Sequence, residues 1–134
     1  MLDREFFRAD AITLAQALVG KIIVRRFPDG SEKHLRITET EAYCGIEDTA
    51  CHAHKGKTKR AEILWRDGGT IYVYLCYGMH EMLNIVSGTD GDPHAVLIRC
   101  CEGFEGPGKL TKELGIDRSL NGLDILSCDG LSIE

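Results

Sequence analysis

The strongest constraint on the fold is the run from Thr70 to Tyr77, in which β-branched and aromatic residues follow one another almost without interruption. Such residues favour the pleated backbone of a strand, so the run predicts a β-strand. The segment Gly78 to His80 predicts a turn, and Met82 to Ser87 predicts the strand that returns from it. The sequence therefore predicts an antiparallel hairpin with Tyr77 near its tip.

Another predicted strand, Lys33 to Tyr43, carries two carboxylates near its end. Side chains alternate between the two faces of a strand, so we expect Ile37, Glu39, Glu41 and Tyr43 to share one face. Neighbours two apart lie about 6.6 Å from each other, so the two carboxylates sense each other's charge. Burial and like charge both raise a carboxyl pKa, which can produce a base that works near neutral pH. The alternative is a wetted sheet face on which both glutamates are merely exposed.

The rest of the chain alternates short strands with amphipathic helices. Asp10 can cap a helix that runs through Leu18, with an apolar side of Ile12, Leu14, Ala15, Leu18 and Val19. A turn at 28–31 joins a predicted strand from Lys21 to Phe27 to the strand from Lys33 to Tyr43, so the two form a second hairpin. The further predicted elements are a short helix from Asp48, a helix at 61–66, a strand from Ala95 to Cys101, and a helix across Lys109 to Leu114 that Gly106-Pro107-Gly108 opens and Gly115 closes. Four or five strands with peripheral helices predict an α+β fold. We expect a single mixed domain over residues 1–134, on a curved antiparallel β-sheet with a protruding β-hairpin.

Composition narrows the class of protein. No apolar run approaches the ~20 residues of a membrane span, and the charged N-terminus lacks a signal-peptide core, so we expect a cytoplasmic protein. A net charge of −5 is unfavourable for binding nucleic acid, but the positive charges are gathered locally. The cluster in residues 54–60 comprises Lys55, Lys57, Lys59 and Arg60. Such a cluster either contacts a phosphate backbone or is simply a solvated face.

The six cysteines do not form the regular framework of a small secreted domain, so we expect reduced, mostly buried thiols. Cys44, Cys51, His52 and His54 lie close together in the sequence and invite comparison with a zinc site. Their spacing matches none of the usual ligand pairs, so we predict no metal.

Three side chains suggest chemistry by their type and position. Tyr77 at a hairpin tip has little to pack against, and aromatic or apolar wedges on protruding elements part stacked bases. Arg99 ends an apolar strand, where an arginine normally needs an anionic partner; a glutamate in that role could hold a water while staying ionised. His52 titrates near neutral pH and could orient a substrate, or it could be structural.

These features form part of a longer pattern that runs from about Asp10 to Arg99. The pattern comprises Glu39-Thr40-Glu41-Ala42-Tyr43, Glu47-Asp48, His52, Tyr72-Val73-Tyr74, Tyr77-Gly78-Met79-His80, Asn84 and Arg99, and it resumes at Gly106-Pro107-Gly108-Lys109-Leu110. In order and spacing it resembles the alkyladenine (3-methyladenine) DNA glycosylases of the vertebrate and Bacillus type. No single segment would be specific, but the combination is.

The resemblance implies a monofunctional hydrolase that cuts the N-glycosidic bond of damaged purines in duplex DNA, without a cofactor, and so starts base-excision repair. It implies that Glu41 deprotonates the water that attacks C1′, that Arg99 helps to position that water, and that Glu39 is structural. It further implies that Tyr77, with Met79 beside it, enters the helix where the damaged nucleotide has swung out.

The resemblance also implies a pocket for the flipped base. The base would lie between Tyr43 on one side and His52 with Tyr74 on the other, and Asn84 would disfavour the 2-amino group of guanine. The basic cluster would contact the DNA backbone. We expect the substrate to be double-stranded DNA containing alkylated or deaminated purines, and the protein to be associated with the nucleoid.

Family members of this type continue for several dozen residues past the position of Glu134, so we expect a C-terminal part of the family domain to be lacking. An alternative function is therefore a catalytically impaired relative that binds damaged DNA without cutting it. A small-molecule hydrolase that uses Glu41 and His52 is a third possibility. We expect a monomer, or a dimer that covers an open sheet edge.

Overall fold

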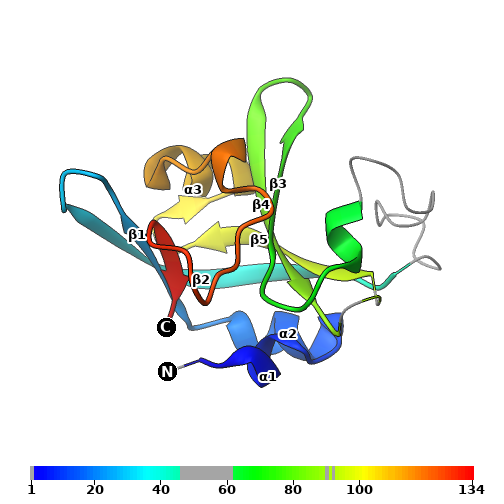
Figure 1. Cartoon of the computed structure of the whole chain (residues 1–134). Helices are drawn as coiled ribbons and strands as arrows, with labels where there is room; N and C mark the ends of the chain where they lie inside the picture. The colour runs from blue at the N-terminus through cyan, green and yellow to red at the C-terminus, as the bar shows by residue number, and fades with distance from the viewer. Residues whose placement is uncertain (1, 46–61, 90, 92) are drawn as a thin grey trace.

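A strongly curved antiparallel sheet forms the body of the molecule, and helices cover its inner face (Figure 1). The computed structural model describes residues 2–45, 62–89, 91 and 93–134. Within these ranges the strand order is β3-β4-β5-β2-β1-β7, with β6 paired to β5. The elements are α1 (Arg4–Phe7), α2 (Ala11–Leu18), β1 (Ile22–Arg26), β2 (Glu32–Tyr43), the 3₁₀ helix η2 (Glu62–Trp65), β3 (Ile71–Cys76), β4 (His80–Ser87), β5 (His94–Cys101), β6 (Phe104–Glu105), α3 (Pro107–Leu114), the 3₁₀ helix η3 (Arg118–Leu120) and β7 (Leu131–Ile133).

The predicted α+β class and both predicted hairpins are confirmed. The hairpin β3–β4 projects well beyond the sheet (Figure 1). The first half of β2 pairs with β1, and its second half pairs with β5, so one long strand connects two parts of the sheet. The small elements α1, β6 and β7 were not predicted, and the predicted helix at 61–66 is a short 3₁₀ helix. The helix expected from Asp48 lies outside the described residues.

A β-bulge in β2 corrects the prediction about which residues share a face. Ile37 is opposite Cys101, and Thr40 is opposite Ile98, with register shifts on both sides of Glu39. A bulge inserts an extra residue and so reverses the alternation beyond it. Ile37 is consequently buried in the core, whereas Glu39 and the side chains that alternate with it lie on the opposite face.

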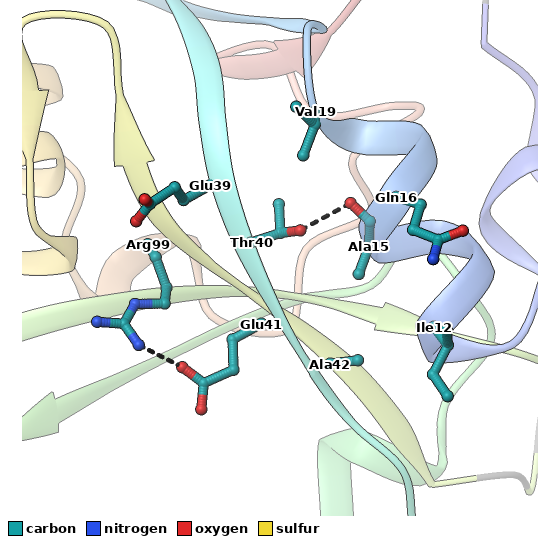
Figure 2. A pocket seen from close by; sticks show the side chains of 9 residues that line it. All are labelled: Ile12, Ala15, Gln16, Val19, Glu39, Thr40, Glu41, Ala42 and Arg99. Carbon is teal, nitrogen blue, oxygen red and sulfur yellow. Dashed lines mark hydrogen bonds and ion pairs between the residues drawn. The ribbon is translucent and has the colours of Figure 1, made fainter.

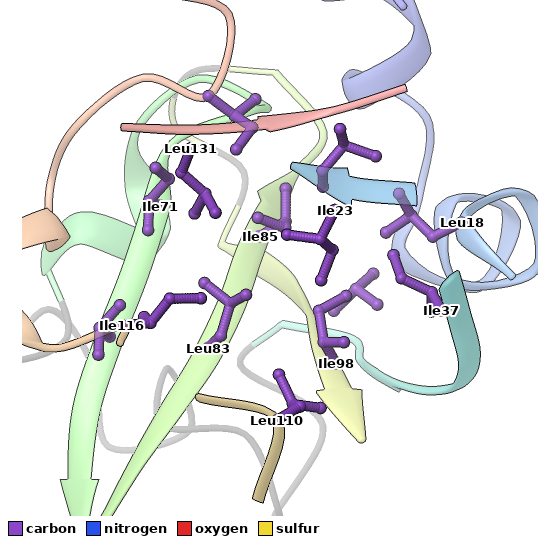
Figure 3. Packing of buried hydrophobic residues seen from close by; sticks show 14 of the residues in the cluster. Leu18, Ile23, Ile37, Ile71, Leu83, Ile85, Ile98, Leu110, Ile116 and Leu131 are labelled. Atoms are coloured by element: carbon purple, nitrogen blue, oxygen red, sulfur yellow. The ribbon is translucent and has the colours of Figure 1, made fainter. Parts of the chain in front are cut away.

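The main core lies on the inner, concave face of the sheet, between the strands and the helices α2 and α3 (Figure 3). Asp10 caps α2 by accepting a hydrogen bond from the Thr13 amide at 2.8 Å, as the sequence predicts. The predicted apolar side of this helix was partly wrong, because Ile12 and Val19 are 57% and 47% exposed. The buried residues are Ala11, Leu14, Ala15 and Leu18, whose spacing of three and four positions defines a single helix face.

The second helix, α3, supports the base of the protruding hairpin. It begins with a proline in its first turn and ends at Gly115, which has a left-handed backbone, as predicted. The buried Thr111 hydroxyl donates a hydrogen bond to the Glu81 carbonyl in β4 at 2.8 Å. Gly108 lies so close to His80 that an added Cβ would come within 2.6 Å of its ring. The hairpin is therefore attached to a rigid support.

The opposite, convex side is called the outer face here, and it carries Glu39, Glu41, Tyr43, Tyr72, Tyr74, Asn84 and Arg99. A small cluster of Ile63, Leu64, Tyr72, Val86 and Ala95 covers part of it, separately from the main core. Among the described cysteines, which exclude Cys51, Cys100 and Cys101 are buried, whereas Cys44, Cys76 and Cys128 are only partly buried. No helix in the described ranges is long and apolar enough to cross a membrane.

Candidate active site

Glu41 is the centre of the candidate site on the outer face (Figure 2). Its Oε2 accepts a hydrogen bond from Arg99 Nη1 at 2.8 Å. Its Oε1 accepts a second one from the Tyr43 hydroxyl at 3.0 Å. Glu41 and Tyr43 lie two residues apart on β2 and therefore point the same way, and the adjacent strand β5 supplies Arg99. The predicted pairing of Arg99 with a glutamate is confirmed.

The ion pair between Glu41 and Arg99 is open to solvent, with 39% and 50% of the two side chains exposed. Exposed ion pairs contribute only about 0–1 kcal/mol to folding, so the fold does not depend on this one. The hydrogen bond that Arg99 donates to Glu41 raises the pKa of Arg99, which keeps the guanidinium charged. Burial and, after it, the bond to Glu41 raise the pKa of Tyr43, so the phenol remains a hydrogen-bond donor.

Glu39 has a different partner from Glu41, although both lie on the outer face. Its Oε2 accepts a hydrogen bond from the Cys100 thiol at 3.1 Å. Burial, with a smaller contribution from Glu39, raises the pKa of Cys100 and keeps this thiol protonated. The two carboxylates thus have different donors, the Cys100 thiol for Glu39 and the Arg99 guanidinium and Tyr43 hydroxyl for Glu41. This arrangement fits the expectation that Glu39 is structural.

The strand register brings distant residues into one row across the outer face. Tyr72 is opposite Asn84, Asn84 is opposite Leu97, and Leu97 is opposite Glu41. Neighbouring strands lie about 4.8 Å apart, so Asn84 and Glu41 are on the order of 10 Å from each other. Asn84 is buried, and its Nδ2 donates to the Tyr72 and Met82 carbonyls at 3.3 Å. Asn84, one of the predicted base-contacting residues, therefore lies in the same row as the carboxylate.

A groove of about 620 Å³ runs beside β2 and opens onto Glu41 and Arg99 (Figure 2). Its volume is in the range of small-molecule sites. The described lining residues are Ile12, Ala15, Gln16, Val19, Glu39, Thr40, Glu41, Ala42 and Arg99. Tyr43 and Tyr74 pack on the small cluster of the outer face instead, and the Tyr72 and Tyr74 rings are 5.3 Å apart. The site thus combines an accessible carboxylate with adjacent aromatic rings.

Tyr77 and Met79 stand at the tip of the hairpin, 92% and 74% exposed. Tyr77 has a φ of 53°, the only positive value of a non-glycine residue in the described ranges, and Gly78 follows at 66°. The Met79 amide closes the turn on the Cys76 carbonyl at 3.1 Å. A left-handed backbone costs an aromatic residue about 1–2 kcal/mol, and strain of this kind is concentrated at functional sites. Tyr77 is therefore held outward at an energetic cost.

Two contacts near the site were not predicted from the sequence. The Tyr43 hydroxyl bond to Glu41 could have been inferred from their spacing of two along a strand. Arg118 lies beside the hairpin base, where its Nε contacts Glu81 Oε1 at 3.3 Å and its side chain lines a hollow of about 390 Å³ with Tyr72 and Tyr74. No local sequence signal indicated that position. The predicted residues His52, Lys55, Lys57, Lys59 and Arg60 lie outside the described residues.

Comparison with known proteins identifies the family of the chain. A family model described as methylpurine-DNA glycosylase matches residues 5–106. Proteins named "Putative 3-methyladenine DNA glycosylase" are similar over most of the chain. The one from Natranaerobius thermophilus is 41% identical over 94% of this chain and 74% of its own length. The one from Borreliella burgdorferi strain ZS7 is 43% identical over 99% and 77%, and the one from Methanocella arvoryzae is 41% identical over 100% and 76%. The chain therefore belongs to the methylpurine-DNA glycosylase family.

Proposed function

We propose that this chain is a DNA glycosylase that hydrolyses the N-glycosidic bond of damaged purines in duplex DNA and so initiates base-excision repair. Family membership supports the reaction class and the DNA substrate. The observation that carries the proposal is the Glu41 carboxylate, which two donors hold while it stays open to solvent. One of these donors is the aromatic residue Tyr43, whose ring packs on the same small cluster as Tyr74. This combination suits a general base next to a flat ligand.

In the proposed reaction Glu41 accepts a proton from a water molecule. The water oxygen bonds to C1′ of the sugar, the bond from C1′ to the purine nitrogen breaks, and its electron pair leaves with the base. The charged Arg99 holds the Glu41 carboxylate with one hydrogen bond and can donate a second one to the same water, since its guanidinium has five N–H groups.

Selectivity for alkylated purines follows from charge. A purine methylated on N3 or N7 is a cation, so it departs as a neutral base without prior protonation. Aromatic faces attract such a cation by about 0.5–2 kcal/mol. We assign Tyr43 to one side of the base and Tyr74, with His52, to the other. The buried Asn84 side chain would disfavour, without excluding, the 2-amino group of guanine. Ordinary guanine would then be spared, whereas 7-methylguanine is cut because its positive charge weakens the glycosidic bond.

The base must leave the helix before Glu41 can act on it, because a stacked nucleotide is inaccessible. We assign this task to the hairpin tip, where Tyr77 fills the gap and Met79 packs beside it. Their exposure and the outward direction of the hairpin support the assignment (Figure 1). Lys55, Lys57, Lys59 and Arg60 are proposed to contact the DNA backbone.

The test is a glycosylase assay on duplex oligonucleotides that contain hypoxanthine, ethenoadenine or 7-methylguanine, followed by alkaline cleavage at abasic sites. We expect strand breaks with the wild type, and a loss of at least 100-fold in rate with Glu41→Gln, because a carboxamide cannot take the proton. Glu41→Gln should still bind lesion DNA.

Glu39→Gln is the matched control, because it makes the same chemical change two residues away on the same face. We expect it to keep its rate within about threefold. Tight binding of lesion DNA by the wild type without any strand breaks would replace this function with that of a lesion-binding relative. Equal losses in both variants would refute the assignment of Glu41 as the base.

A further inference from the structure

We propose that Tyr43 is a positioning residue for the hydrolysis, beyond its role as a wall of the base pocket: its hydroxyl holds the Glu41 carboxylate in the orientation that receives the proton of the water. This inference rests on the proposed glycosylase function. Tyr43 would then have two roles, because the resemblance to the family implies only that it contacts the base.

The geometry at Glu41 carries the inference. Each carboxylate oxygen accepts one hydrogen bond, Oε1 from the Tyr43 hydroxyl at 3.0 Å and Oε2 from Arg99 Nη1 at 2.8 Å. A carboxylate offers about four lone-pair positions, so two remain for the water. One donor alone would leave the carboxylate able to rotate about that single bond. Two donors, from β2 and β5, define the plane of the group.

Tyr43 is well suited to this task because its own position is fixed. Its ring packs on the small cluster of the outer face, while the Glu41 side chain is accessible to solvent. The rigid side chain thus orients the more exposed one. The charged and titratable groups that face the Tyr43 hydroxyl are Glu41 on its own strand, Arg99 on β5 and Tyr74 on β3. Burial keeps the phenol protonated at every pH at which the enzyme would work.

The variant Tyr43→Phe tests the inference, since it keeps the ring for stacking and removes only the hydroxyl. We expect the single-turnover rate on a hypoxanthine duplex to fall about tenfold or more, because a misoriented base loses rate steeply. The dissociation constant for the same duplex should stay within about twofold. A lower rate at an unchanged dissociation constant is what a positioning role predicts, because the base still binds while the carboxylate is misoriented.

A double-mutant cycle separates positioning from other roles of the hydroxyl. In the Glu41→Gln background, Tyr43→Phe should cost little further rate, since there is no carboxylate left to orient. The same tenfold loss in both backgrounds would overturn the inference and indicate that the hydroxyl acts on the base itself. An unchanged single-turnover rate in Tyr43→Phe, with an active wild type, would also overturn it and leave the glycosylase function intact.

If the wild type shows no glycosylase activity, the proposed function is refuted. The hydrogen bond between Tyr43 and Glu41 can still be tested by NMR on the protein without DNA. The side-chain carboxyl ¹³C chemical shift of Glu41 is compared by NMR in the wild type and in Tyr43→Phe at one neutral pH. We expect the resonance to move in the variant, because the hydrogen bond from the hydroxyl to Oε1 is lost. Identical chemical shifts in the two proteins would show that the hydroxyl does not hold the carboxylate, and the inference would fall.

Discussion

Replacing Tyr77 by asparagine should make the protein more stable and a weaker DNA binder at the same time. The φ of 53° costs a non-glycine residue about 1–2 kcal/mol, and asparagine tolerates this region better than other residues. Because 92% of Tyr77 is exposed, at about 25 cal/mol per Å² its loss removes less than about 0.5 kcal/mol of packing. The net gain is about 0.5–1 kcal/mol, or roughly 2–4 °C in melting temperature.

The loss of DNA affinity follows from the proposed role of the ring. An aromatic side chain that stacks on a base contributes about 1–3 kcal/mol, so the dissociation constant for lesion DNA should rise about 5- to 150-fold in Tyr77→Asn. Thermal unfolding and fluorescence anisotropy with a hypoxanthine-containing duplex measure the two effects separately. The comparison is made at one salt concentration, because affinity for DNA depends strongly on salt.

Leu126→Asn is a suitable control for affinity, because it also replaces a partly exposed apolar side chain by asparagine. Leu126 lies in the turn that follows Asp124 and is not part of the hairpin β3–β4. We expect it to leave the dissociation constant unchanged. A fall of several degrees in melting temperature for Tyr77→Asn would show that the ring packs in the folded protein. Unchanged affinity for lesion DNA would refute the role of the hairpin tip as a wedge.

Two further predictions concern stability. In Gly68→Ala the new Cβ would lie 2.2 Å from the Phe7 carbonyl oxygen, a backbone atom that cannot rotate away. We therefore expect the free energy of unfolding, measured in urea, to fall by about 3 kcal/mol. A fall of less than about 1 kcal/mol would contradict this contact. The hydrogen bond from Arg4 lowers the pKa of Asp124. The ionised carboxylate therefore stabilises the fold above about pH 4, and this contribution to the free energy of unfolding is lost as the pH falls through the lowered pKa. Asp124→Asn should therefore show a shallower loss of stability between about pH 4 and pH 2, and an unchanged slope would refute the linkage.

Much of the local structure could be read from short-range patterns. The two hairpins followed from runs of β-branched and aromatic residues separated by turn residues. The start of α2 at Asp10 and the end of α3 at Gly115 followed from capping preferences, because these depend on the residue at one position. The short elements β6 and β7 were missed, since two or three residues carry too little pattern and become strands only by pairing with β5 and β1.

By itself, the sequence determined the kinds of element, the exposed aromatic tip and the pair Glu41 and Tyr43 on one face, because alternation along a strand is a local property. The tertiary structure decided which face the earlier residue Ile37 would occupy, since a bulge depends on how β2 must bend to pair with both β1 and β5. It also decided the partners of the carboxylates. Arg99 and Cys100 are about sixty residues away along the chain, and only the pairing of β2 with β5 brings each to its own glutamate.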